Sequence, residues 1–335
     1  MSETPDQTQI GTPDESPTWR PKAPLAWFFG CAALLFILRA VLAYVALPPA
    51  AAAVASVFTT GIFIVVPFAG LFCGAAFAWR PPQAWVLTLA GIILHGGSLA
   101  ALQSLKPPPA TALVLGNFMQ VGMLGWTLGL GALVSILIKE RNMLLPIAIF
   151  LAGMDALLIL TPFTPQAQIA MNNPQVVGNL GLKVPAVKSS GAEQLPLAVN
   201  DILFVGPADL FISAMFFAAM FRYGLRARQT ATWLIPVLVG YLFLVLLTHM
   251  PLPALVPIGL TALIVNWKEF RLSKDEKAAT GLVLAIALAM AAYGAYAKAT
   301  YKPPKPPAGS LPSPDGQAPG EPGQNTGPTL PGQHR

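Results

Sequence analysis

The segment LLPIAIFLAGMDALLIL, at residues 144–160, is apolar throughout apart from one acidic residue, Asp155. A second apolar segment, ILFVGPADLFISAMFF at residues 202–217, contains Asp209. Both segments belong to apolar stretches whose length is close to the roughly 20 residues that a helix needs to cross a bilayer. The chain has 14 acidic residues, and none of the others lies in such a stretch. An ionised carboxylate in hydrocarbon costs at least about 2.5 kcal/mol, so two retained intramembrane aspartates indicate a function.

The overall composition places the chain among integral membrane proteins. Of 335 residues, 55% are hydrophobic and 10% are charged, and the mean hydropathy is +0.62, which excludes an ordinary soluble core. The net charge of +6 comes from short clusters of Lys and Arg between apolar runs. It therefore indicates contact with an anionic lipid bilayer and not with nucleic acid. Cys31 and Cys73 lie in apolar segments without metal or disulfide spacing, and we expect neither a metal nor another cofactor.

Apolar runs bounded by Pro, Gly and charged residues predict an all-α membrane protein, a polytopic bundle of about nine transmembrane helices within residues 23–297. The tails 1–22 and 298–335 are polar or rich in Pro and Gly, and we expect them to be disordered. Residues 163–201 form the one long extramembrane loop; its part 175–187 is compatible with a short edge strand or hairpin and equally with an irregular linker. The predicted helices are 23–47, 50–79, 84–105, 110–138, 143–162, 202–224, 230–248, 251–267 and 279–297.

Basic residues gather on one side of the predicted spans and indicate the orientation. The opposite loops carry only Lys106, Lys183 and Lys188. Cytoplasmic loops carry the excess of Lys and Arg, so the N-terminus is expected in the cytoplasm and the 163–201 loop outside it. Three lysines after the last span argue against an outside C-terminus or against a count of nine. The basic residues on the N-terminal side are Arg20, Lys22, Arg80, Lys139, Arg141, Arg222, Arg226, Arg228, Lys268, Arg271, Lys274 and Lys277.

The two aspartates are predicted to lie at the same depth in the membrane. Asp155 precedes Pro162, near the end of its span, by the same number of residues as Asp209 follows Ile202, the start of the next span. Consecutive spans run antiparallel, so at 1.5 Å per residue both carboxylates lie about 10 Å below the same membrane face. Equal depth allows the two carboxylates to face each other.

Helix-breaking residues accompany the aspartates. The residues Gly206, Pro207 and Ala208 directly precede Asp209, and they loosen the helix because proline lacks a donor and small residues allow close approach. Prolines at alternate positions open the eighth predicted span and leave carbonyls unpaired, which is tolerated only beside protein or a water-filled cavity. That second element is Pro253-Ala254-Leu255 with its flanking prolines Pro251 and Pro257.

On these motifs the chain resembles the presenilin and signal peptide peptidase family of intramembrane aspartyl proteases, over roughly residues 143–267. Two departures are Met154 in place of the family's usual tyrosine and Ala208 in place of the glycine before the second aspartate. Four predicted spans precede the first motif where the family has five, and one further span follows the last. The matching elements follow the family's order, with the same one span (230–248) between the second and the third: Met154-Asp155, then Gly206-Pro207-Ala208-Asp209, then Pro253-Ala254-Leu255.

The resemblance implies an intramembrane aspartic endopeptidase of a prokaryotic inner membrane, acting on transmembrane segments or membrane-retained signal peptides. Asp155 and Asp209 would be its catalytic pair, sharing one proton and activating a water. Substrates would preferably have a cytoplasmic N-terminus, and an extended substrate could add as a strand to the loop residues 176–187 or to the Pro-Ala-Leu element. The supporting residues would be Gly206, Pro207, Ala208, Pro253, Ala254 and Leu255.

Other functions remain open for the same aspartates. They could carry protons in a proton-coupled transporter, tether helices, or belong to a catalytically inactive, protease-like binding module. No internal inverted repeat typical of many transporters is evident. Arg39, midway along the first span, is left out of the site, as are His95 and His249. Two amides of the fourth span, Asn117 and Gln120, are interpreted as interhelical hydrogen-bonding groups.

Overall fold

The computed structural model describes residues 19–161, 179, 181–190, 201–248 and 253–301, without the side chains of 201–203 and 245–248. All elements discussed below belong to one compact unit, residues Met1–Ala299, and the remainder is a separate unit. Most of the predicted tails, much of the 163–201 loop, and His249 and Pro251 lie outside the described residues.

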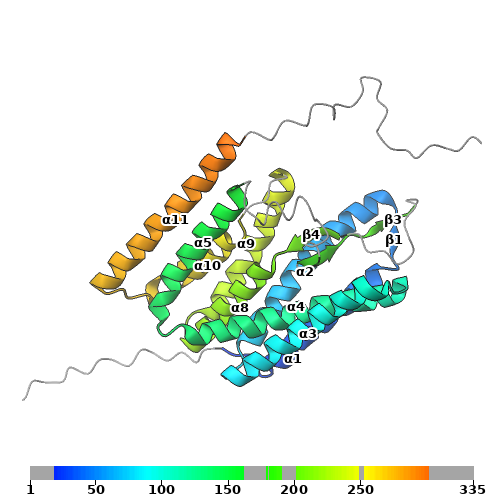
Figure 1. The fold of residues 1–335 in the computed structure, drawn as a ribbon, viewed down its shortest axis with the longest axis horizontal. Coiled ribbons are helices and arrows are strands. Elements are labelled where there is room, and N and C mark those ends of the chain that lie inside the picture. Colours follow the sequence, from blue (N-terminus) through cyan, green and yellow to red (C-terminus); the bar gives the residue numbers. More distant parts are fainter. Residues whose placement is uncertain (1–18, 162–178, 180, 191–200, 249–252, 302–335) are drawn as a thin grey trace, which may run out of the picture. The chain divides into compact units, whose positions relative to one another are not determined.

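Nine α-helices occur in the described part of the chain, one at each predicted range (Figure 1). Six helical segments, Arg141–Leu160 among them, are long and apolar enough to cross a membrane, so the chain is an all-α, multi-pass membrane protein as predicted. Proline near the start of several helices fixes where they begin, because its missing N–H is unpaired there in any case. The helices are α1 (Pro24–Leu42), α2 (Pro49–Ala75), α3 (Pro81–Leu105), α4 (Pro109–Leu137), α5 (Leu144–Leu160), α8 (Pro207–Arg222), α9 (Ala227–Thr248), α10 (Leu255–Asn266) and α11 (Lys274–Thr300), with single 3-10 turns at Arg141–Met143 and Trp267–Glu269.

Two helices that were predicted as full spans are shorter than expected. The helix predicted from residue 202 begins at Pro207, and the one predicted from residue 251 begins at Leu255. The backbone of Gly206 is extended, with φ −61° and ψ 143°, and Pro207 has no N–H with which to bond a preceding carbonyl. The chain before α8 is therefore not helical. At 16 and 12 residues, α8 and α10 fall below the roughly 20 residues of a simple span.

Two small sheets flank the helices, so the strand alternative in the predicted loop is correct for part of it. Strand β2 (Leu182–Pro185) pairs antiparallel with β4 (Asp201–Val205), with Leu182 opposite Val205. Strand β1 (Ala46–Leu47) pairs in parallel with β3 (Lys188–Ser189). The loop thus returns to the bundle and leads directly into α8 through β4.

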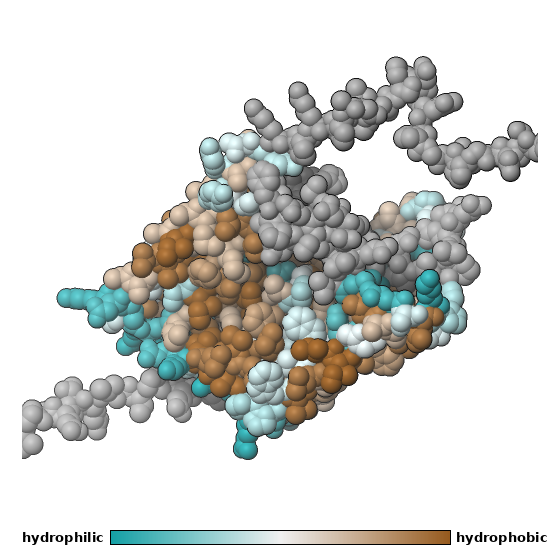
Figure 2. All heavy atoms as spheres, viewed as in Figure 1, coloured by the Kyte–Doolittle hydropathy of each residue, from teal (hydrophilic) through white to brown (hydrophobic). Residues whose placement is uncertain are grey.

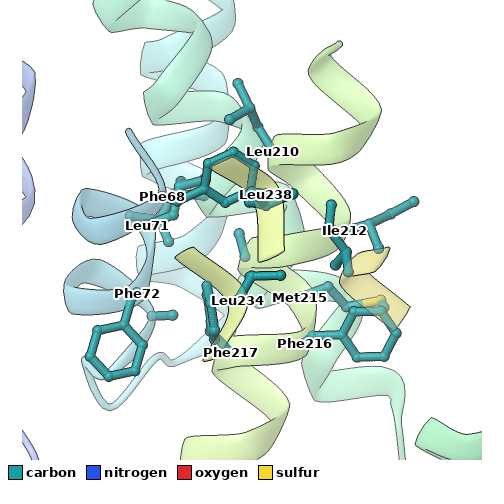
Figure 3. Packing of buried hydrophobic residues seen from close by; sticks show 14 of the residues in the cluster. Phe68, Leu71, Phe72, Leu210, Ile212, Met215, Phe216, Phe217, Leu234 and Leu238 are labelled. Carbon is teal, nitrogen blue, oxygen red and sulfur yellow. The ribbon is translucent and has the colours of Figure 1, made fainter. Parts of the chain in front are cut away.

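Helix α8 is the central helix of the bundle. Nearly every residue from Leu210 to Phe221 is buried, as expected for a helix that is apolar on all sides. It packs against α2, α4 and α9, and the approach of α4 is so close that a Cβ on Gly131 would lie 2.8 Å from the Met215 backbone nitrogen. Figure 3 shows its side chains among those of α2 and α9: Phe68, Leu71, Phe72, Leu210, Ile212, Met215, Phe216, Phe217, Leu234 and Leu238.

The outer helices expose apolar side chains. Figure 2 shows hydrophobic residues over much of the visible face, including the region of α5 and α11. Leu282 and Leu288 of α11 and Phe58 of α2 are each more than 60% exposed. Large apolar surfaces of this kind are unfavourable in water and are typical of helices that face lipid.

Candidate functional site

Asp209 lies in the first turn of the central helix. It is the third residue of α8, which begins at Pro207, and its carboxylate, largely buried, accepts a hydrogen bond from the Gly206 backbone N–H. This is one half of a capping box, in which the side chain of the third helical residue binds the N-cap backbone. A Cβ on Gly206 would lie only 3.0 Å from Asp209 Oδ2, so the glycine leaves room for the carboxylate.

Asp155 lies on α5 and contacts the start of α10. Its Oδ2 accepts a hydrogen bond of 2.8 Å from the backbone N–H of Leu255, a residue 100 positions later. Leu255 is the first residue of α10, and its side chain is buried in the core. The Pro-Ala-Leu element predicted from sequence therefore lies against the first aspartate.

The carboxyl groups of Asp155 and Asp209 are close enough to interact electrostatically. Each also lies at the N-terminus of a helix, Asp155 at α10 and Asp209 at α8. Unpaired N–H groups and the helix dipole favour negative charge at such positions. The arrangement brings two acids together and offsets part of the cost of holding a charge away from water.

A third polar group of the site, Tyr241 on α9, was not predicted. Its hydroxyl donates a 2.6 Å hydrogen bond to the carbonyl oxygen of Pro253, and it interacts electrostatically with both Asp155 and Asp209. The Pro253 carbonyl is among those that the proline-rich start of α10 leaves without a helical partner. The available signal was a tyrosine in an otherwise apolar part of the span between the second and third motifs.

The remaining predicted site residues surround this pair. Pro207 is the first residue of α8, Ala208 is exposed beside Asp209, and Pro253 and Ala254 are half-buried before α10. Within the described residues no three His, Cys, Asp or Glu side chains gather as metal ligands would. Among the described residues, the polar groups of the site are two carboxylates, one phenol and backbone N–H donors.

Strand β2 is hydrogen-bonded to the bundle by Arg39 and Gln120, which are not among the predicted site residues. Arg39, 7% exposed, donates a 2.9 Å hydrogen bond from Nη1 to the Lys183 carbonyl. Gln120 Oε1 accepts a 2.9 Å bond from the Lys183 N–H. Because β2 pairs with β4, and β4 leads into Gly206, these bonds link α1 and α4 to the segment that precedes Asp209.

Other polar residues of the bundle have packing roles. Asn117 Nδ2 donates to the Phe36 carbonyl on α1, an interhelical bond of the predicted kind, whereas Gln120 binds a strand and not a helix. His95 on α3 bonds through Nδ1 to the Met119 carbonyl on α4. These contacts hold helices together at a distance from the acids.

The chain matches no known family model, no curated protein and no solved structure at a significant level. The fold and the site therefore define its class: a multi-pass, all-α membrane protein in which two acidic side chains lie at the N-termini of two short helices and interact electrostatically.

Proposed function

We propose that the chain is an intramembrane aspartyl endopeptidase with Asp155 and Asp209 as its catalytic residues. The observation that carries the proposal is that Asp155 binds the start of α10, formed by Pro253, Ala254 and Leu255, and also interacts electrostatically with Asp209. The core at residues 143–267 would be presenilin-like. The protein would have nine spans, with its N-terminus in the cytoplasm of a prokaryotic cell.

The chemistry follows from two acids held together. Like charges at short range cannot both ionise easily, so the pair holds one proton between them. The ionised carboxylate removes a proton from a water, whose oxygen attacks the peptide carbonyl carbon, while the protonated carboxyl donates its proton to the carbonyl oxygen. The first carboxyl then donates its new proton to the peptide nitrogen, the second takes back a proton from a hydroxyl of the tetrahedral intermediate, and the C–N bond breaks to release the amine and the carboxylic acid. General acid–base catalysis of this kind contributes about 10²–10⁴-fold.

The backbone around the pair supports the same role. The Leu255 N–H fixes one oxygen of Asp155 and the Gly206 N–H binds Asp209, so both carboxylates are held by backbone donors. Strand β2 and its neighbour β4, which leads into α8, supply extended backbone next to the acids. An unwound substrate segment could add to that backbone as a strand.

The test uses the full chain in liposomes with a single-span model substrate that has a cytoplasmic N-terminus. We expect wild type to cut the substrate and Asp155→Asn and Asp209→Asn each to lower kcat by at least 100-fold. Asparagine keeps the size of the side chain and its acceptor for the N–H groups. Asp275→Asn, at the exposed start of α11, is the matched control and should cut normally.

The same variants distinguish the alternatives. If wild type cuts nothing but a proton gradient drives solute uptake that requires either acid, the proton-coupled transporter is correct. If the protein neither cuts nor transports while both variants still bind the model span, it is an inactive binding module.

A further inference from the structure

A cationic pocket lies at the end of the bundle opposite the aspartates. Arg222 ends α8, thirteen residues after Asp209 near its start, which corresponds to about 20 Å along the helix. The pocket has a volume of about 450 Å³ and is formed by the ends of α4 and α8, the start of the described chain, and the connection between α2 and α3. Three guanidinium groups line it: Arg20, Arg80 and Arg222.

Two of these arginines are held in place by backbone carbonyls and not by acids. Arg222 uses one terminal nitrogen, Nη1, for bonds to the Ser135 and Ile136 carbonyls, and Arg20 Nη2 binds the Phe221 carbonyl. Part of each five-donor guanidinium remains for another partner. The ion pair found between described residues, Arg226 with Glu269, involves none of the three. Three positive charges around one cavity therefore have no carboxylate partner in the described part of the chain.

An apolar groove lies beside this pocket. It has a volume of about 390 Å³ and lies between the first turns of α1, at Leu25 and Phe29, and the outer side of α3, at Val86 and Ala90. Phe77 and Trp79 line both cavities. Val86 is 68% and Phe29 52% exposed, so the groove opens toward the surroundings of the bundle.

The shared wall between the two cavities is rigid. The rings of Phe77 and Trp79 contact edge to face with centroids 5.0 Å apart, and Trp79 Nε1 donates to the Gly74 carbonyl. Tryptophan with a satisfied N–H is typical of the boundary between headgroups and acyl chains. The wall thus marks the point where a polar cavity gives way to an apolar one.

We propose that these two adjacent cavities bind one phospholipid with an anionic headgroup, its phosphate among the three arginines and an acyl chain along the α1–α3 groove. A soluble anion would use the cationic pocket but leave the exposed apolar groove empty, whereas a lipid fills both. The site lies on the face that carries most of the basic residues, where anionic lipids and basic pockets between helices meet. The proposal is independent of the protease function.

The test is native mass spectrometry of the full chain in detergent, titrated with dioleoyl phosphatidylglycerol or dioleoyl phosphatidylcholine. These lipids share acyl chains and differ in headgroup charge. We expect the anionic lipid to bind at least tenfold more tightly. Arg80→Gln should weaken it about fivefold, the effect of one surface charge near a membrane. Arg141→Gln removes an exposed charge that does not line the pocket, and should change binding less than twofold.

A second pair of variants tests the groove. Ala90→Trp fills it and should weaken phosphatidylglycerol binding at least fivefold, whereas Leu89→Trp, exposed on the same helix but outside the groove, should not. Glycerol phosphate should fail to compete at concentrations where the lipid saturates. Equal binding of both lipids, an unchanged Arg80→Gln protein, or competition by glycerol phosphate as effective as by lipid would each overturn the proposal. If Arg80→Gln does not fold, Arg20→Gln takes its place.

Discussion

Tyr241→Phe tests whether the site depends on the fixed backbone before α10. The Tyr241 hydroxyl donates to the Pro253 carbonyl at 2.6 Å, and Pro253 lies two residues before Leu255, whose N–H binds Asp155. Removing the hydroxyl leaves the carbonyl oxygen without that partner and releases the segment that positions the Leu255 donor.

The expected size of the effect comes from one hydrogen bond. Removing the donor to a part-buried carbonyl costs about 1–3 kcal/mol. If that energy is lost in the transition state, kcat/KM for the model span falls by about 5- to 150-fold, because 1.4 kcal/mol corresponds to a factor of ten. We expect most of the fall in kcat/KM to come from a lower kcat, because Tyr241 acts on the catalytic acids through Pro253.

The matched control is Tyr223→Phe at the other end of the bundle. The Tyr223 hydroxyl also donates to a backbone carbonyl, that of Ile138. Both variants should lose similar thermal stability, but only Tyr241→Phe should lose cleavage. The reasoning is refuted if Tyr241→Phe cuts at the wild-type rate, or if Tyr223→Phe loses as much activity at temperatures where both variants are folded.

Three further predictions follow from individual contacts. Gly206→Ala places a Cβ 3.0 Å from Asp209 Oδ2; the carboxylate must move by a few tenths of an ångström, and cleavage should fall at least tenfold while the melting temperature changes little. Arg39→Met removes a charge-assisted bond to the Lys183 carbonyl, worth about 1.5–3 kcal/mol. Amide hydrogen exchange at β2 should therefore accelerate, and KM for the model span should rise. Unchanged exchange would contradict the role of Arg39. Asn266→Ala removes a fully buried amide that joins α10 to α9 through the Arg226 N–H and Thr230; chemical denaturation should show a loss of at least 2 kcal/mol, and a smaller loss would show that these bonds contribute little.

Much of the helical layout could be predicted from local sequence. Apolar runs of bilayer length and prolines at helix starts depend on residues a few positions apart, so all nine predicted helices occur among the described residues. Their ends were less predictable: β4 replaces the first turn predicted before Pro207, because its strand partner, β2, comes from a distant part of the loop.

The sequence by itself determined that two aspartates lie in apolar segments, whereas their equal depth stays a prediction, because its assumption of a helix from Ile202 was wrong: residues 201–205 form β4 and α8 begins at Pro207. Only the tertiary structure decided that Asp155 meets the start of α10, that Tyr241 binds Pro253 and that Arg39 fastens β2. The placement of the aspartates in apolar segments is a property of hydropathy along each segment. The others are hydrogen bonds between separate elements, up to 144 residues apart for Arg39 and Lys183, and no local pattern in the chain specifies which of many polar groups will meet after the helices pack.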